Sequence, residues 1–284
     1  MNLNLQPPSP LEYFATLVGS DDDLPLLEAA TSLALDEYPE LDVQHTLSEV
    51  DQLIERLRRR LPADAASLHR LWVLNQFFFR ELGFGGNVNH FHDPDNNYPH
   101  KLLQTRRGIP VSLAVLWLEM ARGVGLVAYG VNFPRHFLVK VGVSTGLVVI
   151  DPLTGESLSR EALDERLQDE RQSAFEEEGF DAPLDLYLMP ATPRDILARM
   201  LRNLKDIHQT AEDWPALRAV LDRLVVLQPE AWEHRRDRGL VLAETGQLGA
   251  AVQDLELYLA RAGRSIDRKA IAERVVQLRE ALRG

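Results

Sequence analysis

The stretch Arg106–Leu126, RRGIPVSLAVLWLEMARGVGL, contains the strongest structural signal in this chain. A tight Gly-Ile-Pro turn leads directly into a run of apolar residues. The run predicts a core helix from about Pro110 to Arg122, and Gly123 and Gly125 are typical of the end of such a helix.

The residues after this helix predict a small antiparallel sheet. Residues 126–152 contain three segments rich in β-branched and aromatic residues, LVAYGVNF, HFLVKVG and LVVIDP, and GVSTG between the last two is typical of a hairpin turn. Three antiparallel strands behind a helix predict an α+β core. His136 and Asp151 fall on the last two segments, where a hairpin would set them as a cross-strand pair.

Helices are predicted on the N-terminal side of this core. In residues 1–80, Ser9 is an expected N-cap with Pro10 at the first helical position, and TLSEVDQLIERLRRRL has one apolar face. Residues 84–107 are rich in Gly, Asn, Asp and Pro and predict a long loop that is functional or tightly packed. Residues 156–190 are predicted to be helical and then irregular.

The C-terminal residues 194–284 contain a helical repeat. A shift of 34 residues places Leu217 on Ala251 and Leu221 on Leu255, with small residues where paired helices touch. This pattern resembles the tetratricopeptide repeat, so we expect two units and a final helix that lean on the core.

Composition limits the classes of partner and of chemistry. The 284 residues carry a formal net charge of -12, which disfavours binding to nucleic acid or to an anionic membrane. No cysteine is present, which excludes disulfides, thiolate catalysis and Cys-ligated zinc. The N-terminal residues show no signal-peptide pattern, and no apolar run reaches the ~20 residues of a membrane span. We therefore expect a cytoplasmic protein.

Three stretches together resemble one known family: NHFHDPDNNYPHKLLQTRRGIPVSLAVLWLEMARGVGL, FPRHFLVKV and LVVIDPLTG. They resemble the transglutaminase-like superfamily, and more narrowly the bacterial SirB-type family, which joins such a core to C-terminal tetratricopeptide repeats. The resemblance implies a helical region over residues 1–80, a transglutaminase-like core over 81–190 and repeats over 191–284.

The resemblance also implies a catalytic set and shows where this chain departs from it. Active members of the superfamily begin the core helix with a Cys, and a strand His and a strand Asp activate it; His136 and Asp151 match those two. The Cys position falls near Pro110, which has no nucleophilic atom. Ser112 has a hydroxyl, but it lies about 200° further around the helix axis.

Each of these residues also has a structural interpretation. Ser112 is either a candidate nucleophile or a hydroxyl bound to its own helix terminus. His136 is either a general base or a structural histidine. Asp151 is either the group that orients His136 or the cap of the DPLTG turn. The loop histidines and aspartates lack the fixed spacing of metal ligands, and Asp93–Asn96 is typical of an Asx turn. We predict no metal and no cofactor. The residues predicted to line a groove or binding surface are Asn89, His92, Asp93, Asn96, Arg107 and Pro110.

Two functions from different classes follow from these interpretations. The first is a non-catalytic scaffold, a pseudoenzyme that binds a protein or peptide through the repeats or the core groove. The alternative is a hydrolase or acyl transferase that uses Ser112 with His136 and Asp151, or these last two as a general base on water.

Overall fold

A four-stranded antiparallel sheet forms one layer of the core, in the strand order β3-β4-β5-β6. The computed structural model describes residues 7–87, 89–144, 146–173, 183–263 and 266–283. The strands are β3 (Ala128–Val131), β4 (Leu138–Val143), β5 (Gly146–Ile150) and β6 (Ser157–Leu158). The α+β prediction is confirmed. The prediction of helix from residue 156 is wrong at β6, because a two-residue strand is too short to show a period of its own.

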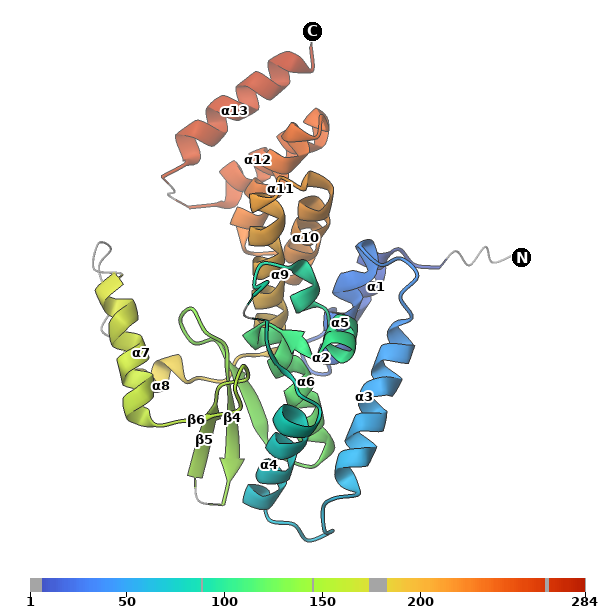
Figure 1. The fold of residues 1–284 in the computed structure, drawn as a ribbon. Coiled ribbons are helices and arrows are strands. Elements are labelled where there is room, and N and C mark those ends of the chain that lie inside the picture. Colours follow the sequence, from blue (N-terminus) through green and yellow to red (C-terminus); the bar gives the residue numbers. More distant parts are fainter. Residues whose placement is uncertain (1–6, 88, 145, 174–182, 264–265, 284) are drawn as a thin grey trace.

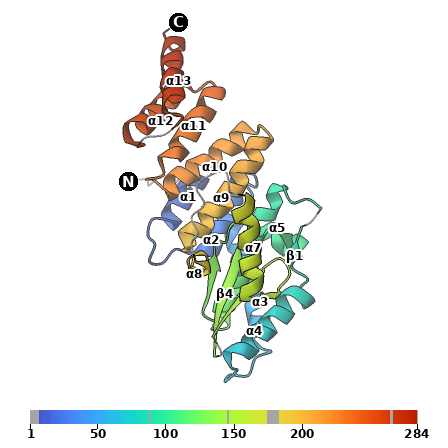
Figure 2. The same ribbon diagram turned by 90° about the vertical axis from the view of Figure 1, so that its left-hand side faces the viewer.

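Helices cover both faces of this sheet (Figures 1 and 2). On one face lies α6 (Pro110–Gly123), which packs against β3 and β4 and is buried nearly all round because it is apolar nearly all round. On the other face lies α7 (Arg160–Ser173), whose Leu163 and Leu167 pack with Leu138 and Val149. The predicted core helix is confirmed.

Helices on the N-terminal side of α6 enclose it further. They are α1 (Pro10–Leu17), α2 (Leu26–Ser32), α3 (Val43–Arg58) and α4 (Ser67–Asn75), with the shorter turns η1 (Leu33–Asp36) and η2 (Gln76–Glu81). Ser9 caps α1 in a capping box with Glu12, as its position predicts.

The segment predicted as one long loop contains ordered elements, so that prediction is partly wrong. It holds β1 (Gly85–Gly86), which pairs in parallel with β2 (Arg107–Gly108), as well as η3 (Pro94–Asn97) and α5 (Pro99–Thr105). Pro99 starts α5, and Leu102 and Leu103 are buried on its inner side. The polar residues just before α5 mask this short helix in the sequence.

The C-terminal helices stack away from the sheet toward the C-terminus (Figure 1). After α8 (Leu184–Tyr187) come α9 (Pro193–Thr210), α10 (Trp214–Leu227), α11 (Trp232–Glu244), α12 (Leu248–Arg261) and α13 (Arg268–Ala281). Each of α10 to α13 packs on the helix before it. The aligned positions Leu217, Leu221, Ala251 and Leu255 are all buried, as a tetratricopeptide arrangement requires.

Apolar packing and two arginines join the first repeat helices to the core. The largest apolar cluster contains side chains from α1 to α6, from the sheet and from α9 to α11. Arg194 of α9 donates to the carbonyl oxygens of Val18 and Leu227, each at 2.6 Å, and Arg223 of α10 pairs with Asp36. The division of the chain at residues 80 and 190 stays a prediction.

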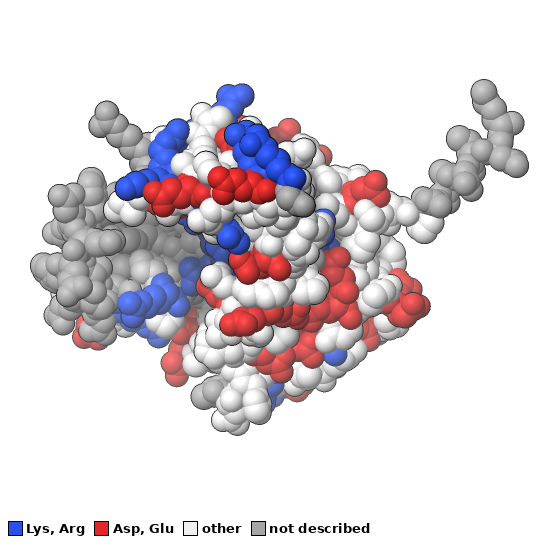
Figure 3. Space-filling model, turned by 90° about the horizontal axis from the view of Figure 1, so that it is seen from above, with Lys and Arg blue, Asp and Glu red and all other residues white. Residues whose placement is uncertain are grey.

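The surface reflects the acidic composition. On the face in Figure 3, Asp and Glu side chains gather in a broad patch that contains few Lys or Arg side chains. Within the described ranges, no helix is both long enough and apolar enough to cross a bilayer.

Candidate functional site

The start of α6 is the position that holds the nucleophile in the superfamily pattern. Pro110 is the first residue of α6 and is partly exposed, while Ser112 is fully buried. The Ser112 hydroxyl lies 2.5 Å from the carbonyl oxygen of Asn96, to which it donates, and accepts from the Ile109 N–H at 3.2 Å. Both partners are backbone groups, so this hydroxyl ties the helix terminus to the preceding loop.

Asn96 holds that loop in place from the inside. Its amide Nδ2 donates to the carbonyl oxygen of His90 at 2.6 Å, and its Oδ1 accepts from Asn87 Nδ2 at 2.9 Å. Because Asn96 is itself buried, these bonds satisfy polar atoms that water does not reach.

The other predicted groove residues lie on the outside of the same loop. Asn89, His92 and Asp93 are exposed, and Asp93 caps η3 by accepting from the Asp95 N–H at 3.0 Å. Arg107 is exposed as well and donates to the Gly83 carbonyl oxygen at 2.6 Å. Their role in binding stays a prediction.

His136 and Asp151 lie just outside the strands on which they were predicted. His136 is partly buried in the turn before β4, and Asp151 follows the last residue of β5. The register pairs Val139 of β4 with Ile150 of β5. Continued by one residue, this register places Asp151 opposite Leu138, which follows His136 by two residues in the sequence.

The Asp151 carboxylate has two partners among the described residues, and both serve the local fold. Its Oδ1 accepts from the Leu153 N–H at 2.9 Å, which caps the turn after β5, and its Oδ2 lies 3.2 Å from Arg166 Nη1 of α7. This buried carboxylate therefore fixes the turn and joins α7 to the sheet.

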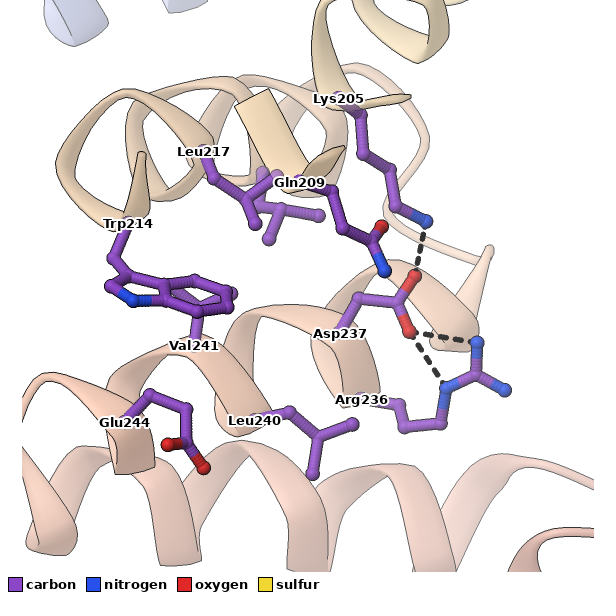
Figure 4. Close-up of a pocket in the computed structure, with 10 residues that line it drawn as sticks. Lys205, Gln209, Trp214, Leu217, Arg236, Asp237, Leu240, Val241 and Glu244 are labelled. Carbon is purple, nitrogen blue, oxygen red and sulfur yellow. Dashed lines mark hydrogen bonds and ion pairs between the residues drawn. The ribbon is translucent and has the colours of Figure 1, made fainter. Parts of the chain in front are cut away.

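The C-terminal helices contain a second candidate site, a groove between α9, α10 and α11 with a volume of about 460 Å³ (Figure 4). Trp214 and Leu240 are partly exposed apolar side chains of this groove, and Leu217 and Val241, which also line it, are buried. The Trp214 indole N–H and the Gln209 carboxamide have no hydrogen-bond partner among the described residues. We call this the repeat groove; its lining residues are Lys205, Gln209, Trp214, Leu217, Leu221, Arg236, Asp237, Leu240, Val241 and Glu244.

Ion pairs fix one wall of the repeat groove. Asp237 accepts from Lys205 of α9 and, at 2.8 Å, from Arg236 Nε, and Arg236 also binds Asp267 at 2.6 Å. Burial lowers the pKa of Arg236, but the bonds to Asp237 and Asp267 outweigh burial and raise it, so the guanidinium stays charged.

Leu217 and Leu221 of this groove were identified from the sequence as repeat positions, but none of the lining residues was predicted as a ligand contact. The repeat pattern predicts a concave surface but not which side chains point into it. The signal in the sequence that points to this groove is Trp214, the residue directly after the helix N-cap Asp213.

Residues 44–202 match the transglutaminase-like superfamily, and residues 204–276 match the tetratricopeptide repeat. The chain belongs to the transglutaminase-like superfamily. The resemblance seen in the sequence is therefore confirmed, and with it a transglutaminase-like core that contains no cysteine.

Relatives of this transglutaminase-like protein occur in several bacteria. It is 37% identical over 240 residues to a UPF0162 protein of Xylella fastidiosa, with 84% of each chain covered. A UPF0162 protein of Pseudomonas aeruginosa is 31% identical over 217 residues, covering 76% of this chain and 77% of its own. This chain thus belongs to the UPF0162 family as well.

A more distant likeness is limited to one segment. The mouse F-box only protein 21 is 39% identical over 68 residues, which are 24% of this chain and 11% of that protein. No solved structure matches this transglutaminase-like chain.

The loop histidines and aspartates do not assemble a metal site. Over the part of the chain that the structure describes, no group of three or more His, Asp or Glu side chains is arranged to hold a metal ion.

Proposed function

We propose that this chain is a non-catalytic protein-binding scaffold. In this proposal the repeat groove holds a segment of a partner protein, and the transglutaminase-like core supports the groove. The observation that carries the proposal is the apolar surface of Trp214 and Leu240 beside the carboxamide of Gln209, which has no hydrogen-bond partner among the described residues. An apolar side chain of the partner fits against the apolar surface, and a peptide group of the partner can form hydrogen bonds with the Gln209 carboxamide.

The chemistry of the core supports a role without a covalent step. The chain has no cysteine, and Pro110 begins the core helix. Ser112 is bound to backbone groups and has no contact with solvent, whereas a nucleophile must reach its substrate. Asp151 is bound to Arg166 and to the turn after β5.

The alternative function, a hydrolase or acyl transferase with Ser112 as nucleophile, has less support. It requires the Ser112 hydroxyl to leave the Asn96 carbonyl oxygen and turn toward an imidazole. A general-base role of His136 with Asp151 on water does not require this movement, but Asp151 is already bound to Arg166 and to the Leu153 N–H.

The proposal is tested by cross-linking from the repeat groove in the host cell. A photo-cross-linking amino acid replaces the exposed Gln209, and in a matched control it replaces the exposed Gln52 of α3. The partner captured from position 209 is then purified and titrated with the wild-type chain and with Trp214→Ala and Leu240→Ser. Because a groove tryptophan is a typical hot spot, we expect Trp214→Ala to weaken binding about 30-fold.

Two results would contradict the scaffold. One is an unchanged dissociation constant for Leu240→Ser, measured on a variant whose circular dichroism shows the native helix content. The other is a change in the partner's mass on incubation with wild type that Ser112→Ala or His136→Ala abolishes. That second result would establish the enzyme.

A further inference from the structure

A cavity separate from the repeat groove lies between the turn after η1 and helix α5, with a volume of about 410 Å³. Tyr38 and His100 form its aromatic part, with their ring centroids 4.9 Å apart. We call it the α5 cavity; its lining residues are Glu37, Tyr38, Pro39, Glu40, Leu41, His100, Lys101 and Gln104.

Carboxylates outnumber cations around the α5 cavity. Glu37 and Glu40 line it, and Asp95 of η3 lies behind it, where it accepts from the Tyr38 hydroxyl at 2.5 Å. Lys101 lines the cavity too, but it is held by Asp95 at 3.3 Å and lies 4.3 Å from the centre of the Tyr38 ring. The local charge therefore favours a positively charged ligand.

The two lining carboxylates differ in their availability. Glu37 accepts from the Tyr98 hydroxyl and lies 3.3 Å from His208 Nε2. Glu40 is exposed and forms no hydrogen bond or ion pair with any residue that the structure describes. Glu40 is thus the carboxylate that an incoming cation can bind without displacing an existing partner.

His100 supplies an independent sign of a ligand. Its side chain is only 7% exposed, yet neither ring nitrogen has a hydrogen-bond partner among the described residues. Burial lowers the pKa of His100, and the nearby Lys101 lowers it further, so the imidazole is neutral near pH 7. A neutral imidazole has one nitrogen lone pair that can accept a hydrogen bond. A buried acceptor without a donor is costly, and a ligand N–H removes that cost.

We propose that the α5 cavity binds an arginine side chain of a basic segment in a partner protein, with Glu40 as its counter-charge and His100 as an acceptor. Arginine fits better than lysine because its planar fork can donate to a carboxylate and to a second acceptor at once. The Gln104 carboxamide, exposed at the rim, offers a further acceptor. This site lies on other elements than the repeat groove and does not depend on the scaffold proposal.

The test uses fluorescein-labelled hexa-arginine as probe and the full chain, with fluorescence anisotropy at low and at moderate salt. We expect Glu40→Gln to weaken binding about 3- to 10-fold, because it removes one charged hydrogen-bond partner. The matched control Glu273→Gln changes an exposed carboxylate on α13 and is expected to leave the dissociation constant unchanged. Trp214→Ala in the repeat groove is also expected to leave it unchanged.

A second measurement reads His100 directly. Binding of hexa-arginine is expected to shift the imidazole 15N resonances of His100 in the folded chain, and Glu40→Gln is expected to reduce that shift at equal probe concentration. His100→Gln, which keeps an acceptor, is expected to bind more tightly than His100→Phe.

Three outcomes would overturn the proposal. Equal weakening by Glu40→Gln and Glu273→Gln would mean general attraction to an acidic surface. Unmoved His100 resonances at saturating probe would place the ligand elsewhere. Spermine that binds as tightly as hexa-arginine, with the same sensitivity to Glu40→Gln, would make the cavity a polyamine site and not a site for a protein side chain.

Discussion

At the scale of single residues, Ser112 shows how one hydroxyl can have a structural role in a position that suggests catalysis. Its bonds to the Asn96 carbonyl oxygen and the Ile109 N–H hold the loop on the start of α6. The distinction between these roles depends on where the hydroxyl points, and the residue type alone does not report that.

Ser112→Ala is expected to lower the free energy of unfolding by about 1–3 kcal/mol, because it leaves buried backbone groups without a partner. Urea unfolding measures this loss. Ser144→Ala, at an exposed serine whose hydroxyl has no partner among the described residues, is the control and is expected to stay within about 0.5 kcal/mol of wild type. A Ser112→Ala variant as stable as wild type would contradict the structural role.

His100 predicts a pH dependence of stability. Since burial lowers its pKa in the folded chain, the unfolded chain takes up a proton first as the pH falls below about 6.5. Stability is therefore full above that pH and falls toward acid, by at most about 1.4 kcal/mol per pH unit for this group.

Urea unfolding at pH 7.5 and at pH 5.5 measures this pH dependence. His100→Gln is expected to show a smaller loss of stability between the two pH values than wild type. The same substitution at the exposed His69 is expected to leave the loss as it is in wild type. If wild type and His100→Gln lost the same unfolding free energy between pH 7.5 and pH 5.5, His100 would not contribute to the pH dependence of stability.

At the scale of elements, local patterns predict the long helices and strands well and the short elements poorly. The apolar run of α6 and the β-branched segments of β4 and β5 can be recognised from neighbouring residues alone. In contrast, α5 and β6 have few residues and follow polar, turn-forming stretches, so no period identifies them.

The packing of α11 on α12 depends on a glycine. A Cβ at Gly239 would lie 2.8 Å from the Leu255 side chain and 3.2 Å from the Ala251 carbonyl oxygen, whereas a Cβ at Gly249 would have no atom within 4 Å. Gly239→Val is expected to cost about 1–3 kcal/mol of unfolding free energy through overpacking. Gly249→Val is expected to stay within about 0.5 kcal/mol. If urea unfolding showed that Gly239→Val and Gly249→Val change the free energy of unfolding equally, α11 and α12 would not be closely packed at Gly239.

At the scale of the whole molecule, stability is expected to decrease along the repeats. The side chains of α9 and α10 belong to the largest apolar cluster, while α12 and α13 form a second, smaller one with part of α11. Because each repeat helix relies chiefly on its neighbours, the last helix has the least support.

Native-state hydrogen exchange measures this gradient. Amides of α13 are expected to exchange well before those of α6, with α10 close to α6. Exchange of α13 and α6 at one common rate would instead indicate a single cooperative unit.

The α+β core, the helical repeats and the absence of a thiol can be recognised from the sequence alone, because each depends on composition or on the spacing of near neighbours. The folded structure was needed to show that Ser112 faces Asn96, that His100 is buried beside Tyr38 and that Trp214 and Gln209 meet in one groove. Those contacts join residues from different elements. Their free energies depend on how the elements pack, which no local period encodes.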